Sequence, residues 1–350
     1  MKPSLWFVSM RGRARIVAVA AQFFAGSCSG GPASTSGAVT GSGPASVLRR
    51  PLVGAAQPQA PLLPPSGTIY FGAFVNFQKT LPPFEQQTAE FEQAIDRKLA
   101  IHAEYYKWTQ DFPAAPEVDD FRNGRIPVIS WDCGATNYEI AQGKQDAVII
   151  NRAQVAKTYG HPFFLRWFWE MNLPYADENR QKCVDPKRDT NGVFNPTDYI
   201  AAWQHIHDIF VAQGATNVVW LWCPSGNVTI QPQPYYPGAA DVDWVGFDHY
   251  DVTGDAGLVA TMSDGYNAVV QFDQPILVGE TGPPGDAGNQ GTYLVTAPSL
   301  LQANFPQIRA WIYYDAYGHR EDWRLIPAAG IAAARAAGAT PYISAYYKFK

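Results

Sequence analysis

Eight short apolar runs follow one another along the chain from residue 67 onward. The runs cover residues 68–75, 100–108, 125–131, 162–168, 217–222, 242–247, 275–278 and 308–314. They are nearly continuous in hydrophobicity, whereas a strand with one wet face alternates apolar and polar residues. Near-continuous runs of this length are typical of parallel strands that are covered on both faces. The pattern therefore predicts eight buried parallel strands.

Helical patterns lie between most of these runs. We predict helices over residues 88–99, 144–160 and 195–212, the last with Thr197 as its N-cap. Strands that alternate with helices favour an α/β fold, and eight of them favour a single (β/α)8 TIM barrel over residues 67–350. No glycine-rich phosphate loop follows the first run, which argues against a dinucleotide-binding fold.

The chain before residue 67 differs in composition and hydrophobic pattern. Four basic residues precede an apolar stretch over 16–25, which is the arrangement of an export signal and is too short to span a bilayer. Small residues before Cys28 resemble a bacterial lipoprotein cleavage site, although Ala25 stands where leucine is usual. We expect a signal over 1–28, followed by a flexible Gly/Ser/Pro/Ala-rich linker over 29–66. The protein is then a monomer that is either secreted or tethered to the membrane through a lipid on Cys28.

The composition narrows the classes of function. Charged residues make up 16% of the 350, the formal net charge is -5 and the pI is about 5.7. No basic surface for nucleic acid is therefore expected. Aromatic residues are abundant, with 11 Trp, 18 Tyr and 19 Phe. Core packing explains most of the Phe, whereas flat Trp faces also suit stacking against sugar rings.

The cysteines allow one disulfide in the predicted domain. Cys28 belongs to the signal, and an exported protein can pair two of the three others. Two pairings, Cys133–Cys183 and Cys183–Cys223, would clamp the long loop over 173–194. The cysteine left over would be a buried thiol.

Ionisable groups directly follow three of the predicted strands. Glu170 follows the fourth strand, Asp248 the sixth and Glu280 the seventh. The carboxyl ends of barrel strands share one rim, where active sites lie. Burying a carboxylate there costs free energy unless it is ion-paired or takes part in binding or catalysis. An ion pair with Arg166 is the structural alternative to a catalytic role. Two carboxylates about 5–5.5 Å apart, one protonated and one ionised, are the machinery of retaining glycoside hydrolysis.

Signals for other chemistry are missing from the sequence. There is no His-Glu-x-x-His spacing, so we expect no catalytic metal, and we expect no cofactor. There is no Gly-x-Ser-x-Gly elbow of a serine hydrolase either.

Six segments around these carboxylates resemble glycoside hydrolase family 26, the β-mannanase family, in the same order along the chain. The clearest reads Phe-Leu-Arg-Trp-Phe-Trp-Glu-Met-Asn over residues 164–172, and the others lie at 199–203, 214–224, 235–238, 242–250 and 275–282. The resemblance extends over about residues 70–341. It implies a retaining barrel glycosidase with catalytic glutamates on strands four and seven.

The resemblance also implies roles for single residues. Glu170 matches the acid/base and Glu280 the nucleophile. Arg166, Asn172 and Tyr250 match residues that support them. The family usually has His immediately before the acid/base, where this chain has Trp169. Tryptophan offers one donor and a large stacking face, so this difference bears on the substrate more than on the mechanism.

Further candidates for substrate binding come from their positions near strand ends. Trp169, Trp222, Trp311 and Tyr313 offer stacking faces, and core packing is the alternative for the last three. Asp248 is expected either to bind a sugar hydroxyl or to orient a neighbouring side chain.

Taken together, the sequence predicts a retaining endo-acting hydrolase of a β-linked polysaccharide, with β-1,4-mannan as the first substrate to test. β-Glucan and β-xylan are alternatives with the same mechanism. A non-catalytic, glycan-binding surface lipoprotein is the alternative from another class, and it would not need both Glu170 and Glu280.

Overall fold

The computed structural model describes residues 62–76, 84–174, 178–226, 229–252, 257–285, 288–318, 321–344, 347 and 349. All of them belong to one compact unit, Ala56–Lys350. The predicted signal with Cys28, and the linker up to residue 61, lie outside the described residues.

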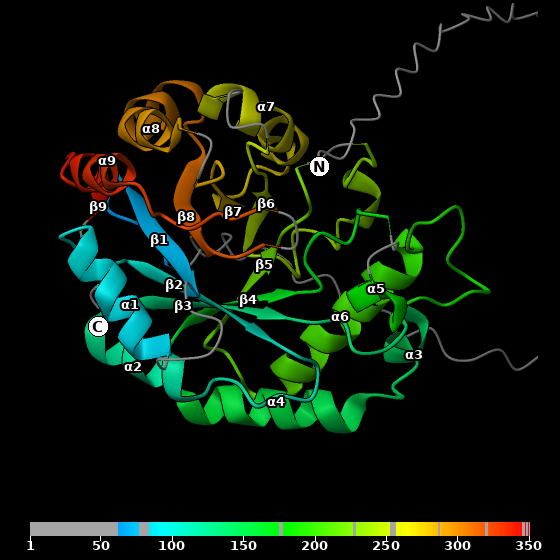
Figure 1. Cartoon of the computed structure of the whole chain (residues 1–350). Helices are drawn as coiled ribbons and strands as arrows, with labels where there is room; N and C mark the ends of the chain where they lie inside the picture. Colours follow the sequence, from blue (N-terminus) through cyan, green and yellow to red (C-terminus); the bar gives the residue numbers. More distant parts are fainter. Residues whose placement is uncertain are drawn as a thin grey trace, which may run out of the picture. The chain divides into compact units, whose positions relative to one another are not determined.

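Eight parallel strands form a closed barrel (Figure 1). They are β1 (Ile69–Asn76), β2 (Ile101–Tyr106), β3 (Ile126–Trp131), β4 (Phe163–Trp167), β5 (Val218–Trp222), β6 (Trp244–Asp248), β7 (Ile276–Thr281) and β8 (Ile308–Ala316). Each strand pairs with its neighbour in chain order, and β1 closes the ring by pairing with both β2 and β8. A two-residue strand, β9 (Ile343–Ser344), adds to β1. The prediction of a (β/α)8 barrel is confirmed.

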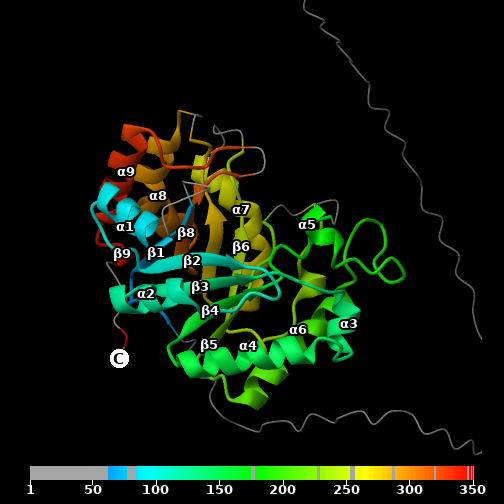
Figure 2. The ribbon, with the colours of Figure 1, turned by 60° about the horizontal axis from the view of Figure 1, so that its bottom comes forward.

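The long helices lie around the outside of the strands, as the two views in Figures 1 and 2 show. The described helices are α1 (Phe84–Ala94), α2 (Ala115–Asn123), α3 (Asn137–Ala141), α4 (Asp146–Tyr159), α5 (Glu178–Gln181), α6 (Pro196–Gln213), α7 (Gly257–Val269), α8 (Gln290–Asn304) and α9 (Ala328–Gly338). Short 3-10 turns cover η1 (Gln233–Tyr235) and η2 (Val270–Phe272).

Three predicted helix boundaries are wrong, and one of them is the start of α1, which lies at Phe84 and not at residue 88. The cap of α6 is Asn195, whose side chain accepts hydrogen bonds from the backbone N–H groups of Thr197 (3.0 Å) and Asp198 (3.3 Å). Thr197 therefore lies inside the first turn, after a proline that is well suited to that position. Helix α1 ends at Ala94, before the end that we predicted, because Asp96 has a φ of 53° and turns the chain out of the helix.

Alternation along the strands creates two cores. One face of each strand points into the barrel, and the interior is filled by residues such as Ile101, Phe164, Leu221, Trp244 and Leu277. The other face packs against the surrounding helices and forms the larger core. Most of the fully buried tryptophans belong to this outer core, namely Trp131, Trp167, Trp203, Trp222 and Trp311.

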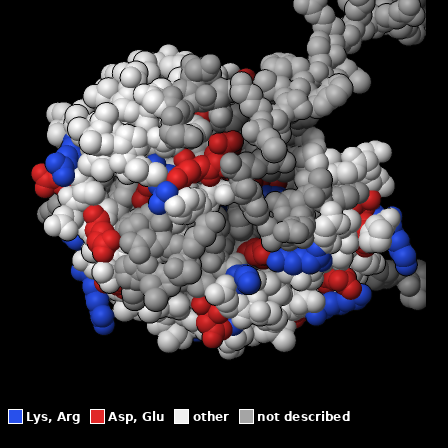
Figure 3. Space-filling model, viewed as in Figure 1, with Lys and Arg blue, Asp and Glu red and all other residues white. Residues whose placement is uncertain are grey.

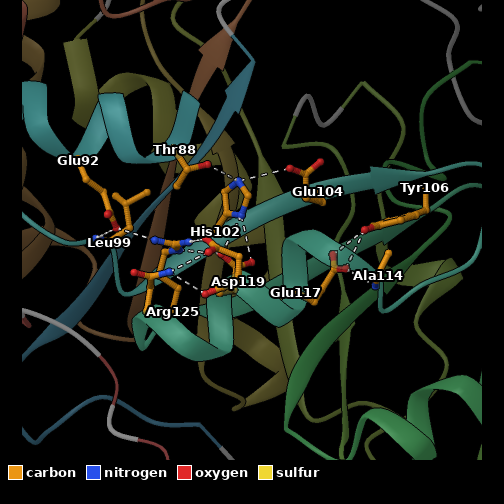
Figure 4. Close-up of polar contacts among 12 residues, drawn as sticks. Thr88, Glu92, Leu99, His102, Glu104, Tyr106, Ala114, Glu117, Asp119 and Arg125 are labelled. Atoms are coloured by element: carbon orange, nitrogen blue, oxygen red, sulfur yellow. Dashed lines mark hydrogen bonds and ion pairs between the residues drawn. The ribbon is translucent and has the colours of Figure 1, made fainter. Parts of the chain in front are cut away.

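A buried polar cluster fastens helices α1 and α2 to the outer face of β2 (Figure 4). His102 Nδ1 lies 3.0 Å from Asp120 Oδ2, and His102 Nε2 lies 3.2 Å from Thr88 Oγ1. Arg125 donates through Nε to Asp120 at 2.7 Å. These four side chains are almost fully buried, so no substrate reaches them and their role is structural.

The surface supports two further statements. No helix in the described ranges is long and apolar enough to cross a membrane. On the face shown in Figure 3, acidic and basic side chains are interspersed, in line with the small net charge of -5.

Candidate active site

A pocket of about 390 Å³ opens at the carboxyl end of the barrel. Its lining mixes aromatic and ionisable side chains: Phe74, Asn76, Tyr105, Asp132, Phe168, Trp169, Glu170, Arg180, Glu280, Tyr314, Ala316 and Tyr317. This is the rim where barrel enzymes carry their active sites. Both predicted catalytic glutamates therefore lie in one pocket.

Strand alternation explains which side chains reach the floor of this pocket. Inward-pointing positions near the ends of successive strands are Phe74, Tyr105, Ser130, Arg166, Cys223, Asp248 and Tyr314. The polar ones bond to one another in the middle of the barrel. Arg166 is fully buried there and contacts most of them.

Glu280 receives hydrogen bonds from three donors. Its Oε1 accepts from Arg166 Nη2 at 2.7 Å and from the Tyr105 hydroxyl at 2.5 Å. Its Oε2 accepts from the Tyr250 hydroxyl at 2.6 Å. A carboxylate anion only accepts, so the anion is the form of Glu280 that fits all three donors. The carboxylate is thereby oriented from both sides.

Arg166 is itself held by Asp248 and Ser130. Its Nη1 donates to both oxygens of Asp248 at 2.8 and 2.9 Å, and Nε and Nη2 donate to Ser130 Oγ. Asp248 is 1% exposed, so of its two predicted roles the geometry fits the orienting one and not a contact with sugar. The ion pair with Arg166, which was the structural alternative for these carboxylates, is present for Glu280. It lies at the floor of the pocket rather than at a remote site.

Glu170 sits in a different environment. Its side chain is 19% exposed, and Oε2 accepts from Arg180 Nη2 at 3.2 Å. Burial raises the pKa of Glu170 to about 7; the charge of Arg180 opposes this shift and the charge of Glu280 adds to it. A carboxyl with this pKa is partly protonated near neutral pH and can donate a proton.

The other predicted site residues fall into three positions. Trp169 lines the pocket, with its ring 5.3 Å from the guanidinium carbon of Arg166 and edge-to-face with Tyr105. Tyr250 reaches Glu280 as described. Asn172 lies below the rim, where it donates to Ser225 O and Ile230 O and accepts from the Ser225 N–H. It therefore fixes the loop after β5 and does not line the pocket.

Three substrate-binding predictions are corrected by the strand alternation. Trp222, Trp311 and Tyr313 point outward and are almost fully buried between the barrel and its helices. Trp222 packs edge-to-face against Tyr236, and Trp311 packs against Phe71. None of the three lines the pocket.

Sequence reasoning missed most of the pocket lining, and three of the missed residues are Tyr314, Tyr105 and Arg180. Tyr314 is the inward neighbour of Tyr313, and the period of two in strands could have found it from the inward Ile312. Tyr105 stands near the end of the second strand, which is the same kind of signal that identified Glu170. Arg180 lies in the long loop after β4, for which periodicity gives no signal.

That loop is clamped by a disulfide between Cys133 and Cys183. Of the two pairings open from the sequence, the structure contains this one, and Cys223 is the buried thiol. The ammonium of Lys182 also pairs with the carboxylate of Asp132, next to the disulfide. The loop is therefore tied to the end of β3 beside the pocket.

One group of possible metal ligands lies outside the pocket. Among the residues that the structure describes, the ligand atoms of His207, Asp208 and Asp241 lie within 4.8 Å of one another. None of these three residues lines the pocket.

Comparisons with known proteins point to one family. Glycosyl hydrolase family 26 matches residues 161–329, the part that carries Arg166, both glutamates and Tyr250. Endoglucanase H of Acetivibrio thermocellus is 30% identical over 272 residues, 73% of this chain and 28% of that protein. Mannan endo-1,4-beta-mannosidase A and B of Caldalkalibacillus mannanilyticus is 32% identical over 90 residues, 25% of this chain and 16% of that protein. The chain thus spans less than a third of either relative.

Solved structures share the fold. A mannanase of Bacillus subtilis superposes with a TM-score of 0.54 at 17% identity, covering 80% of this chain and 86% of that one. A beta-mannanase from a symbiotic protist of the termite Reticulitermes speratus has a TM-score of 0.54 at 15% identity, covering 80% and 89%. These two likenesses concern the fold alone. The match to the family over residues 161–329, together with the two relatives, shows that the chain belongs to glycosyl hydrolase family 26.

Proposed function

We propose that this chain is a retaining, endo-acting glycoside hydrolase that cleaves a β-linked polysaccharide by double displacement. One observation carries the proposal: two carboxylates of the same pocket differ in environment. The pKa of Glu170 is raised to about 7 by burial, whereas Glu280 accepts hydrogen bonds from Arg166, Tyr105 and Tyr250. A protonated acid beside an ionised nucleophile is what this reaction needs.

Each residue has a defined part in the two steps. In the first, Glu170 gives its proton to the glycosidic oxygen while Glu280 attacks the anomeric carbon, so the leaving chain departs and a glycosyl-enzyme forms. In the second, Glu170 takes a proton from a water molecule, which attacks the same carbon and releases Glu280. Arg166 and Tyr250 keep the carboxylate of Glu280 in position for both steps.

We propose β-1,4-mannan as the substrate, because the family resemblance and the relative named as a mannan endo-mannosidase point to it. β-Glucan is the second candidate, and two observations favour it. Trp169 replaces the usual histidine beside the acid/base. The relative that is 30% identical over 73% of this chain is named an endoglucanase.

Product analysis tests this proposal. The full chain is incubated with β-mannan, mixed-linkage β-glucan and β-xylan, and the released oligosaccharides are separated by chromatography. The Glu280→Ala variant is the negative control. The Arg188→Gln variant is the matched positive control, because Arg188 lies in the loop after β4 but pairs with Asp198, and neither of them lines the pocket.

The outcomes separate the alternatives. Oligosaccharides from mannan that Glu280→Ala does not release support the proposal as stated. Products from β-glucan alone keep the mechanism and move the substrate to the second candidate. Binding of a glycan without any product over a long incubation favours the non-catalytic surface lipoprotein, and equal activity in Glu280→Ala refutes the assigned nucleophile.

We also propose that the protein works outside the cytoplasm. The export pattern over residues 1–28 and the disulfide between Cys133 and Cys183 support this location, because disulfides persist in oxidising compartments. Labelling with radioactive palmitate tests the lipid. Label that disappears in Cys28→Ser supports a surface anchor, whereas unlabelled protein in the medium supports simple secretion.

A further inference from the structure

We propose that Arg180 is a positioning residue for Glu170, and that the Cys133–Cys183 disulfide holds Arg180 in that position. The inference rests on the proposed function, because it takes Glu170 as the acid/base. It adds a residue on a loop outside the barrel strands to the machinery that controls the proton.

One guanidinium contacts both the backbone and the carboxyl of Glu170. Arg180 Nη1 donates to the main-chain oxygen of Glu170 at 2.8 Å and to that of Trp169 at 3.3 Å. Arg180 Nη2 donates to Oε2 of Glu170 at 3.2 Å. The planar fork of arginine suits such a shared contact, which a lysine ammonium reproduces only in part.

The backbone at this point needs external support. Glu170 has a φ of 54° and Phe168 a φ of 41°, which non-glycine residues rarely adopt. The N–H of Glu170 donates to the carbonyl of Cys223 at 2.8 Å and holds one side of the turn. The contacts from Arg180 to the carbonyls of Trp169 and Glu170 hold the other side.

The disulfide fixes the segment that carries Arg180. Helix α5 has only four residues, too few to be stable alone. Cys183 donates its N–H to the carbonyl of Arg180 at 2.9 Å, and its side chain is bonded to Cys133. The ion pair between Lys182 and Asp132 reinforces the same attachment. Loss of the disulfide would therefore let Arg180 move away from Glu170.

The charge of Arg180 has a directional effect on proton affinity. The charged or polar groups that face Glu170 from the surrounding elements are Arg180, Arg166, Glu280, Ser225, Asp248 and Tyr314. Burial raises the pKa of Glu170, and Arg180 is the largest influence in the opposite direction. Without Arg180 the carboxyl should hold its proton to a higher pH.

A titration that needs no substrate tests the first part. Glutamate labelled with carbon-13 at the carboxyl is incorporated, and the Glu170 signal is assigned by its loss in Glu170→Gln. We expect the pKa of Glu170 to rise by about one unit in Arg180→Gln, to return part of the way in Arg180→Lys, and to stay unchanged in Arg188→Gln. An unchanged titration in folded Arg180→Gln overturns the proposal.

The double variant Cys133→Ser/Cys183→Ser tests the second part. We expect the titration of Glu170 to move in the same direction as in Arg180→Gln. A titration equal to that of the wild type overturns the role of the disulfide. The NMR result stays readable even in a protein without hydrolase activity, so failure of this inference and failure of the proposed function can be told apart.

Kinetics give a second readout if the proposed hydrolysis holds. In Arg180→Gln we expect the rate to fall and the basic limb of the kcat/KM profile to move to higher pH, together with the NMR titration. Arg180→Lys should recover part of that rate. A loss of rate with the basic limb in its wild-type position would mean that Arg180 only supports the fold.

Discussion

Arg166 on β4 and Glu280 on β7 form an ion pair of 2.7 Å, although they lie 114 residues apart in the chain. The two residues meet only when the barrel strands assemble, and Asp248 on β6 pairs with the same guanidinium. Such a buried charge triplet is costly to assemble unless every member is bonded. The floor of the pocket therefore ties correct folding to the orientation of the proposed nucleophile.

The two tyrosines on Glu280 should matter for catalysis and not for folding. Tyr105→Phe and Tyr250→Phe each remove one hydroxyl that donates to the carboxylate. We expect kcat/KM to fall roughly 10- to 100-fold in each, equivalent to about 1.4–2.7 kcal/mol. Tyr313→Phe is the matched control, because its hydroxyl bonds to Gln290 and the Trp323 carbonyl outside the pocket. Steady-state kinetics should show no change of this size in the control.

Trp169 should influence which sugar is accepted. Trp169→His restores the residue that the family usually has beside the acid/base, and removes a stacking face from the pocket. We expect the ratio of kcat/KM for mannan to that for β-glucan to rise. Trp222→Phe should leave this ratio unchanged, because Trp222 is buried outside the barrel. A ratio that moves equally in both variants would contradict a direct role for Trp169.

The rate should depend on the protonation of Glu170. Its pKa is raised to about 7, and the first step requires the protonated form. We therefore expect kcat/KM to decline as the pH rises through about 7. In Glu170→Ala this decline should disappear from the remaining activity toward an aryl glycoside with a good leaving group. A basic limb that persists unchanged in the variant would assign the titration to another group.

The cluster at His102 should make stability fall at alkaline pH. Burial alone would lower the pKa of His102, but the charge and hydrogen bond of Asp120, and the charge of Glu104, raise it to about 9. Folding is then favoured while His102 is protonated in the native state, so its contribution is full below about pH 6.5 and is lost as the pH rises through about 9. Burial also raises the pKa of Glu104, to about 8, and acts in the same direction.

Chemical denaturation between pH 6 and pH 10 measures this effect. We expect the free energy of unfolding to fall by up to about 3 kcal/mol over that range. The decline should be weaker in His102→Gln. The surface variant His205→Gln should retain it, since His205 pairs with the half-exposed Asp146. Identical pH dependence in His102→Gln and the wild type would contradict the assignment.

The barrel and the strand ends at its pocket were predictable because buried parallel strands have a simple sequence pattern. The eight apolar runs coincide with β1–β8, and the position directly after a run identified Glu170, Asp248 and Glu280. This works because burial of both faces is a local property of each strand. The helix boundaries were less accurate, because Asn195 acts through side-chain hydrogen bonds and Asp96 through its positive φ, and neither appears in the hydrophobic pattern.

The stacking residues were harder to predict because a strand alternates with a period of two. Trp311 and Tyr313 occupy the outward positions of β8, while Ile312 and Tyr314 occupy the inward ones. A shift of one residue moves every side chain to the other face. The large size of a tryptophan does not reveal which core it belongs to, since both cores of this barrel are rich in aromatic rings.

Arg180 could not be predicted, because its position depends on a loop and a disulfide. Two pairings of Cys183 were open from the sequence, and only Cys133–Cys183 ties the loop to the end of β3. The contact of Arg180 with Glu170, ten residues away in the same irregular loop region, depends on that closure and leaves no periodic pattern.

The anomeric configuration of the first product tests the proposed double displacement most directly. Proton NMR follows the reducing-end signals during the first minutes of hydrolysis, on the polysaccharide that the wild type cleaves fastest. Two displacements at one carbon, by Glu280 and then by water, retain the configuration. We therefore expect the β-anomer to appear first, and the α-anomer only later by mutarotation. An α-anomer that appears first would contradict the covalent role of Glu280 and would mean that a single water attack inverts the bond.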